Sequence, residues 1–163
     1  MEFAELTKHE EKKEYAGFWI RAAAYLIDGI IVGIPLYAIY FFITMLIMGA
    51  ANGFSDETLS DSDSAALIIG MIILFLITFI AVTLYFSLMN SSKWQATLGK
   101  KLIGLKVTDL EGKRISFWRA FGRFFAMYLS GIFYIGYIMA AFTEKKQSLH
   151  DLIAGTVVVK SRN

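Results

Sequence analysis

Two long apolar runs dominate the pattern of hydrophobic and polar positions along this chain. The first, Ala22–Met48, contains one charged residue, Asp28, and the second, Ala65–Met89, contains none. A helix needs about 20 predominantly apolar residues to cross the hydrocarbon core of a bilayer. We therefore expect transmembrane helices at 22–48 and 65–89. Pro35 is a candidate for a kink in the first helix, because proline removes one backbone donor.

A third apolar run, 124–142, lies near the lower length limit for a span. It is interrupted by Ser130, Gly131 and Gly136. The run either crosses the membrane once or enters and returns as a re-entrant hairpin. Irregular backbone at membrane depth is tolerated only where protein buries it.

Alternating residues after the second long run predict a small β-structure. Apolar side chains alternate with others over residues 103–108, turn-forming residues occupy 109–113, and the alternation resumes over 115–117. This pattern is typical of a β-hairpin. The β-branched segment 156–160 is a candidate third strand, which would stabilise a hairpin that is marginal alone. Such pairing requires the C-terminal segment and the hairpin to share one side of the membrane, which favours re-entry of 124–142.

Charge is distributed unevenly between the predicted loops. The segment 49–64 carries four acidic and no basic residues, whereas 90–123 carries eight basic residues. Because cytoplasmic loops are enriched in Lys and Arg, we expect 49–64 outside and 90–123 inside. The chain then divides into a polar cytoplasmic N-terminal segment, 1–16, and a single membrane domain, 17–160, that ends in a C-terminal lobe, 143–160. Both chain ends are predicted to be cytoplasmic.

Composition excludes several classes of function. Hydrophobic residues make up 56% of the 163 residues and charged residues 18%, against about 25% charged residues in soluble domains. There is no cysteine, and the two histidines lie far apart in the sequence, so we expect no disulfide, metal site or cofactor. The run 97–100 lacks the preceding glycine of a phosphate-binding loop, which argues against nucleotide binding. No nucleophile with supporting residues is visible, so neither an enzyme nor a nucleic-acid-binding protein is indicated.

Arg21, Tyr25 and Asp28 share one face of the first predicted helix. A carboxylate inside a bilayer costs about 2.5–3.5 kcal/mol at a helix centre, so Asp28 needs a partner or a polar cavity. The candidate partners are Arg123, Lys100 and His150. The arrangement is either a structural ion pair, which we favour, or a proton or cation site. Gly29 and Gly33 form a small-residue pair that we expect to serve packing within the chain.

Short polar motifs outside the long runs have structural interpretations. Thr97 is expected to cap a helix at the membrane exit, followed by basic anchors. Asp151 is expected to cap a short turn, and His150 to pack at the membrane surface. A proton-shuttle role for His150 is the alternative, since its ordinary pKa lies near 6.5.

Taken together, these motifs resemble the RDD family of bacterial membrane proteins, named for one arginine and two aspartates. The matching segments are Gly17–Asp28, Gln95–Leu102 and Ser148–Thr156, with Leu98 where the family usually has proline. The resemblance assigns the named positions to Arg21, Asp28 and Asp151. Supporting positions are Tyr25, Thr97, Gly99, Lys100, Arg119, Arg123, His150 and Gly155.

The resemblance implies a multi-pass protein of the bacterial cytoplasmic membrane and leaves two hypotheses for its function. A short Bacillus-type member of the family restrains a signal peptide peptidase, so the first hypothesis is a regulatory subunit that binds another membrane protein. Some members are described as cation/proton antiporters, so the second is a small self-associating transporter that uses Asp28. Two or three helices are few to enclose a transport pathway, and no inverted repeat is visible.

Overall fold

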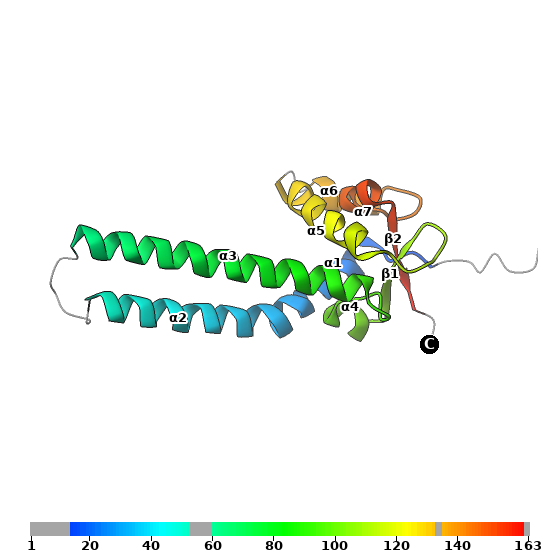
Figure 1. The fold of residues 1–163 in the computed structure, drawn as a ribbon. Helices are drawn as coiled ribbons and strands as arrows, with labels where there is room; N and C mark the ends of the chain where they lie inside the picture. Colours follow the sequence, from blue (N-terminus) through cyan, green and yellow to red (C-terminus); the bar gives the residue numbers. More distant parts are fainter. Residues whose placement is uncertain (1–13, 53–59, 133–134, 162–163) are drawn as a thin grey trace, which may run out of the picture.

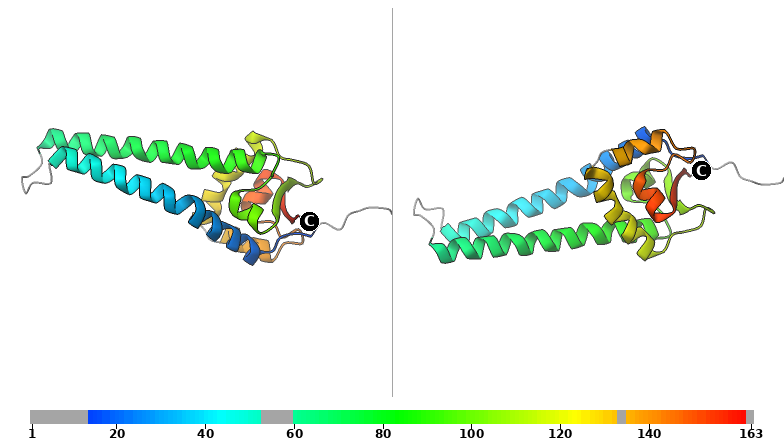
Figure 2. Two further views of the ribbon diagram at one scale, coloured as in Figure 1. Left: turned by 90° about the horizontal axis from the view of Figure 1, so that it is seen from below. Right: turned by 90° about the horizontal axis from the view of Figure 1, so that it is seen from above.

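The computed structural model describes residues 14–52, 60–132 and 135–161. Two long helices form a hairpin that projects from a smaller body of short helices and strands (Figure 1). The same projection is seen from above and from below (Figure 2). Most of the polar segment predicted at 1–16, and the middle of the loop predicted at 49–64, lie outside the described residues.

The first long helix is continuous but changes its winding near the middle. It consists of α1 (Phe18–Asp28), a π-helical stretch η2 (Gly29–Gly33) and α2 (Ile34–Asn52). In η2 the Ile34 N–H donates to the Gly29 carbonyl, five residues back, as in a π-helix. The irregularity expected at Pro35 therefore lies in the turn just before it. Nothing lies within 4 Å of a Cβ built on Gly29 or Gly33, so their predicted role in packing within the chain is wrong.

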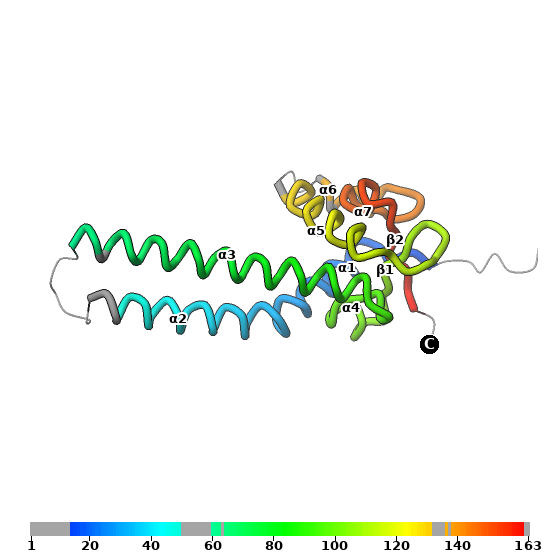
Figure 3. Tube along the Cα trace, viewed as in Figure 1, coloured from blue at the N-terminus to red at the C-terminus, as the bar shows by residue number. Residues whose placement is uncertain are grey.

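The second arm of the hairpin is α3 (Asp61–Ser91), which runs back beside α2 (Figure 3). Within the described chain, Phe18–Gly49 and Ser64–Ser91 are long and apolar enough to cross a membrane. These stretches confirm the two long apolar helices predicted from the sequence, and both extend slightly beyond the predicted ends.

The third apolar run folds back on itself. It forms α5 (Phe117–Ile132), α6 (Ile135–Ile138) and a 3-10 turn η3 (Met139–Ala141). A Cβ on Gly136 would lie 2.8 Å from Cα of Ser130, so glycine permits α6 to approach α5 this closely. No part of this run, as described, qualifies as a candidate span. The fold-back is the shape that the re-entrant interpretation requires, and entry of this run into the membrane stays a prediction.

The sheet has two antiparallel strands, β1 (Leu105–Asp109) and β2 (Thr156–Lys160), with Val107 opposite Val158. Pairing of the C-terminal segment with the 103–108 region is therefore confirmed, but the predicted hairpin between 103–108 and 115–117 is wrong. The Lys113 N–H donates to the Asp109 side chain at 2.7 Å and closes a tight loop. The Ser116 hydroxyl then accepts the Arg119 N–H at 3.3 Å, which caps α5 and starts a helix where a strand was expected.

A small core holds the two strands and the first helix together. We use "the lobe" for α1, α4 (Leu98–Leu102), β1, α5, α6, η3, α7 (Leu149–Ala154) and β2. Its buried core is made of Ala16, Ala24, Leu105, Val107, Ile115, Ala120 and Val158. Because α1 contributes to this core and also begins the first candidate span, it fixes the lobe at one end of the hairpin.

Candidate functional site

Asp151 lies in the first turn of α7 and is fully buried. Ser148, the N-cap residue, donates its backbone N–H to Asp151 Oδ2 at 3.2 Å and its hydroxyl to the same oxygen at 2.7 Å. This is a capping box in which aspartate takes the place of the usual glutamate. The prediction that Asp151 caps a short helix is confirmed.

Two arginines from different helices converge on this carboxylate. Arg123 of α5 donates Nε and Nη2 to Asp151 Oδ1 at 2.9 and 2.6 Å. Arg21 of α1 donates Nη1 to Oδ2, and the Thr156 hydroxyl lies 3.3 Å from Oδ1. Both guanidiniums are almost completely buried. Arg123, one of the three candidate partners of Asp28, therefore pairs with Asp151 instead.

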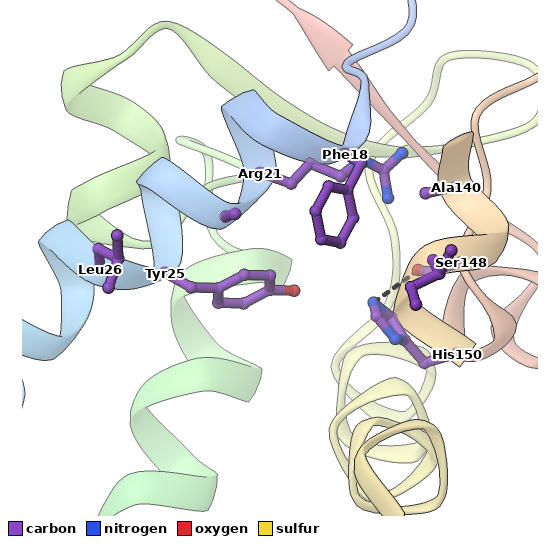
Figure 4. A pocket seen from close by; sticks show the side chains of 9 residues that line it. Phe18, Arg21, Tyr25, Leu26, Ala140, Ser148 and His150 are labelled. Carbon is purple, nitrogen blue, oxygen red and sulfur yellow. Dashed lines mark hydrogen bonds between the residues drawn. The ribbon is translucent and has the colours of Figure 1, made fainter. Parts of the chain in front are cut away.

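Arg21 makes two further contacts that tie distant segments together. Its Nε donates to the Ala16 carbonyl at 2.9 Å, and Nη2 donates to the Lys146 carbonyl at 2.6 Å. Figure 4 shows its side chain extending from α1 towards the segment that carries Ala140 and Ser148. One side chain thus joins the start of the first long helix to the entry of α7.

Electrostatics favour ionised Asp151 and neutral His150. Burial alone would raise the pKa of the Asp151 carboxyl, but the guanidiniums of Arg123 and Arg21 hold it well below its usual range. Burial, reinforced by Arg123, lowers the pKa of His150 to about 3. Its ring nitrogens lie 2.9 Å from the Ser148 hydroxyl and 3.3 Å from the Ser130 hydroxyl. His150 is therefore buried inside the protein, and its position relative to the membrane surface stays a prediction.

Asp28 forms a second, separate site. Its carboxylate accepts the Thr97 hydroxyl at 2.5 Å, the Gly99 N–H at 2.7 Å and the Tyr85 hydroxyl at 3.5 Å. Among the described residues no basic side chain lies within ion-pair distance of it. The structural ion pair predicted for Asp28 is therefore wrong. Asp28, in α1, instead caps the N-terminus of α4. Its carboxylate accepts a hydrogen bond from a free N–H there, and its negative charge is attracted to the positive end of the helix dipole.

Gly99 is required by the close approach of α1 and α4. A Cβ on Gly99 would lie 2.8 Å from the Asp28 nitrogen and 2.9 Å from its carboxyl carbon, and it would also clash with the Ala24 carbonyl. Thr97 occupies the N-cap position of α4, as predicted, but makes no side-chain cap bond. Its hydroxyl turns to Asp28 instead.

Lys100 is a buried cation beside these two sites. Its side chain is 1% exposed, and Nζ has no hydrogen-bond partner among the described residues. The ammonium lies 4.9 Å from the centroid of the Tyr25 ring, a cation–π distance. Burial, reinforced by the positive charge of Arg123, lowers the pKa of Lys100 to about 7.

Comparison with known proteins decides the family. The model of the RDD family matches residues 15–155, which include Arg21, Asp28, Thr97, Gly99, Arg123 and Asp151 of the two sites. The chain belongs to the RDD family.

Three relatives of this chain come from Bacillus subtilis strain 168. The uncharacterized protein YxaI is 47% identical over 150 residues, which cover 88% of this chain and 96% of the relative. The uncharacterized membrane protein YteJ is 32% identical over 162 residues, covering 98% and 87%. The uncharacterized protein YckC is 31% identical over 153 residues, covering 88% and 83%. No solved structure matches the chain. With its two candidate spans, this chain is an RDD family membrane protein.

The three residues that match the RDD name do not form one cluster. Arg21 and Asp151 belong to the buried arginine–aspartate site, whereas Asp28 caps α4. Tyr25 lies on α1 with its ring against Lys100 and its hydroxyl directed towards His150 (Figure 4).

The remaining supporting positions lie at the other end of α7. Gly155 ends this helix with a left-handed φ of 61°, a conformation that favours glycine. A Cβ there would lie 3.7 Å from Nη2 of Arg119. Arg119 is exposed and does not reach Asp151 with a described hydrogen bond or ion pair.

The site residues Tyr85, Ser130, Ser148 and Thr156 were not anticipated. Tyr85 comes from the apolar run of α3 and also accepts the Leu98 N–H at 3.2 Å. The polar residues Thr83, Ser87 and Asn90 recur at helical spacing and are all buried. Tyr85 lies two residues from both Thr83 and Ser87, on a different face of α3, so this stripe does not indicate its role.

Proposed function

We propose that this RDD protein is a non-enzymatic accessory or regulatory subunit that binds another membrane protein within the bilayer. The observation that carries the proposal is the absence of charge from the α2 and α3 parts of the hairpin. No charged residue occurs in α2, or in α3 beyond its first turn. Asp151 and Asp28 lie in the lobe and accept several short hydrogen bonds each.

This absence of charge suits an anchor with a structured lobe better than an ion pathway. A pathway needs polar or ionisable groups facing a cavity at membrane depth. The hairpin instead presents large apolar side chains along one face of α2, including Ile34, Tyr37 and Phe41, which are 62%, 78% and 62% exposed. Such a face can contact either lipid or the helices of a partner. The family resemblance makes a signal peptide peptidase the first partner to test.

The proposed orientation places the lobe in the cytoplasm. The basic residues of 90–123 and of the C-terminal segment lie in or beside the lobe, whereas the loop 49–64 is acidic. The lobe would then meet a cytoplasmic part of the partner, and the α2 face would meet its spans.

The test is affinity capture of the full-length protein from native membranes in mild detergent, followed by quantitative mass spectrometry. The proposal predicts a stoichiometric membrane protein in the captured fraction. The double variant Tyr37→Ala, Phe41→Ala should lose that protein. The matched variant Ile72→Ala, Phe75→Ala, on the exposed surface of α3, tests whether the loss is specific to α2. Capture of the chain alone, or only of further copies of it, would overturn the proposal.

A second candidate, a small oligomeric cation/proton antiporter, is favoured by Lys100. A buried ammonium that has no hydrogen-bond partner in the described part of the chain, and a pKa of about 7, can exchange protons, and Asp28 lies nearby across Gly99. This candidate predicts cation-driven proton movement in reconstituted vesicles that Lys100→Met abolishes in a folded protein. Equal proton movement in wild type and Lys100→Met would reject Lys100 as the exchanging group.

A further inference from the structure

A pocket of about 650 Å³ lies between α1 and the segment from α6 to α7. This volume is within the range of about 300–1,000 Å³ that is usual for small-ligand sites. One wall is a stripe of α1 side chains spaced four residues apart, and the opposite wall comes from α6 and η3. The main apolar lining residues are Phe18, Ala22, Leu26, Ile138 and Ala140.

The pocket has a polar side as well as apolar walls. Arg21, Tyr25, Ser148 and His150 also line it, and Figure 4 shows Tyr25 and His150 facing each other across it. The ligand class is therefore amphiphilic, with a polar group near these side chains and an apolar part along the walls.

The position of α1 places the apolar walls at the membrane boundary. α1 begins the candidate span Phe18–Gly49, and Trp19 is 82% exposed at its start, as is typical of an interfacial anchor. Leu26, two turns deeper, is 71% exposed, and Ile138 on the opposite wall is 47% exposed. The pocket therefore opens where acyl chains surround the helix.

One exposed lysine, Lys146, lies near the Phe18 end of the pocket. The Lys146 carbonyl accepts Nη2 of Arg21 at 2.6 Å, and Cδ of Lys146 lies 3.9 Å from the Cβ position of Gly17. Lys146 is exposed, so its ammonium remains available beside this end. Leu26 lies about 12 Å further along α1, at 1.5 Å per residue. The pocket thus has a cationic end at the interface and an apolar end in the membrane.

We propose that this pocket binds one acyl chain of an anionic glycerophospholipid, with the phosphate beside Lys146 and the chain along Ala22 and Leu26. The order of charge and apolar surface along α1 matches the order of headgroup and chain in such a lipid. Free phosphate would leave the apolar walls uncovered. A zwitterionic lipid would gain less from the cationic end, because its own cation offsets the phosphate.

Native mass spectrometry of the full-length protein with an equimolar mixture of phosphatidylglycerol and phosphatidylcholine tests the proposal. We expect one retained lipid, with phosphatidylglycerol favoured at least fivefold. Ala22→Trp fills the pocket and should reduce retention at least fivefold, whereas Ala38→Trp, at an exposed position of α2, should not. Lys146→Asn removes the charge but tolerates the left-handed φ of 49° found there. It should lower the preference for phosphatidylglycerol, while Lys113→Asn should leave it unchanged.

Blocking the pocket after folding separates loss of the lipid site from misfolding of a variant as the cause of reduced lipid retention. The natural chain has no cysteine, so Leu26→Cys can be modified with a bulky aromatic thiol reagent in the folded protein, with Tyr37→Cys as the control. Modification at residue 26 should displace the lipid, and modification at residue 37 should not. Undiminished retention after modification at 26, or equal retention of the two lipids by the wild type, would overturn the proposal.

Discussion

Arg21 and Asp151 lie 130 residues apart in the chain and form a buried ion pair between α1 and α7. Because α1 begins the first candidate span, this pair joins the membrane hairpin directly to the C-terminal part of the lobe. Arg123 adds two hydrogen bonds from α5 to the same carboxylate. Three elements that are distant in sequence therefore depend on one acidic side chain.

Asp151→Asn should destabilise the protein severely, because it leaves two buried guanidiniums facing a neutral group. Loss of one partner of a buried ion pair costs about 3–5 kcal/mol. Thermal unfolding in detergent, followed by circular dichroism, measures the effect. Glu14→Gln is the matched control, because the Glu14–Lys160 pair is exposed and such pairs contribute less than about 1 kcal/mol. Equal unfolding temperatures for wild type and Asp151→Asn would contradict the structural role of Asp151.

Gly99→Ala tests the contact between α1 and α4. The added methyl group would meet backbone atoms of Ala24 and Asp28, which cannot move away cheaply, and overpacking of this kind costs about 1–3 kcal/mol. Gly122→Ala is the control, since nothing lies within 4 Å of its Cβ position. Within helix α5 this replacement should be neutral or stabilising by up to about 1 kcal/mol. If both variants unfold like the wild type, α1 and α4 are not in close contact.

Acid should weaken the lobe through His150. Between pH 6.5 and about 3 the unfolded chain binds a proton that folded His150 does not accept. Stability should therefore fall as the pH is lowered through this window, by at most about 1.4 kcal/mol per pH unit for this one group. His150→Gln should remove that contribution between about pH 4.5 and 6, above the range in which Asp151 begins to bind protons. An identical pH slope in wild type and variant would refute a buried, neutral His150.

The antiparallel pairing of β1 with β2 predicts a disulfide crosslink between engineered cysteines. Lys106 and Val159 are opposite each other, and antiparallel partners have Cα atoms about 4.5–5.5 Å apart, which suits a disulfide. The pair Lys106→Cys, Val159→Cys should therefore crosslink on oxidation, and Lys113→Cys with Val159→Cys should not.

Single cysteines then test which side of the membrane the lobe occupies. On intact cells an impermeant reagent should label a cysteine at Ser60 and should not label one at Lys113 or Ser161. Labelling at Ser161 without labelling at Lys113 would require a true third crossing. Labelling at both, but not at Ser60, would reverse the proposed orientation.

The sequence predicts the two long helices of the hairpin well because a lipid bilayer leaves a long apolar segment few conformations other than a helix. Runs of about 20 apolar residues have few alternatives to a helix in a bilayer, so both long helices were found close to their observed ends. The β-strands show where pattern alone fails. Residues 103–108 and 115–117 share a period of two, but the Ser116 cap starts a helix at Phe117, and the partner strand comes from the C-terminal segment instead.

The site illustrates a different limit of sequence reasoning. The sequence singles out Arg21, Asp28, Arg123 and Asp151, but helical spacing on α1 places Arg21 and Asp28 on one face and suggests Arg123 as a partner of Asp28. The spacing of residues along a helix shows which of them share a face. It does not show which distant helix supplies their interaction partners. The close approach at Gly99 lets Asp28 bind the N-terminus of α4. At the start of α7, both arginines pair with Asp151 instead.

Ion movement in reconstituted vesicles tests most directly the claim that these buried charges are a scaffold. Purified protein is placed in vesicles with a pH-sensitive dye, and Na⁺ or K⁺ gradients are applied to wild type and Asp28→Asn. A structural Asp28 predicts no proton movement above protein-free vesicles for either protein, and a lower unfolding temperature for the variant, since weakening the hydrogen bonds from Thr97 and Gly99 costs about 1–3 kcal/mol. Cation-driven proton movement in wild-type vesicles that is absent from a stably folded Asp28→Asn protein would contradict the account.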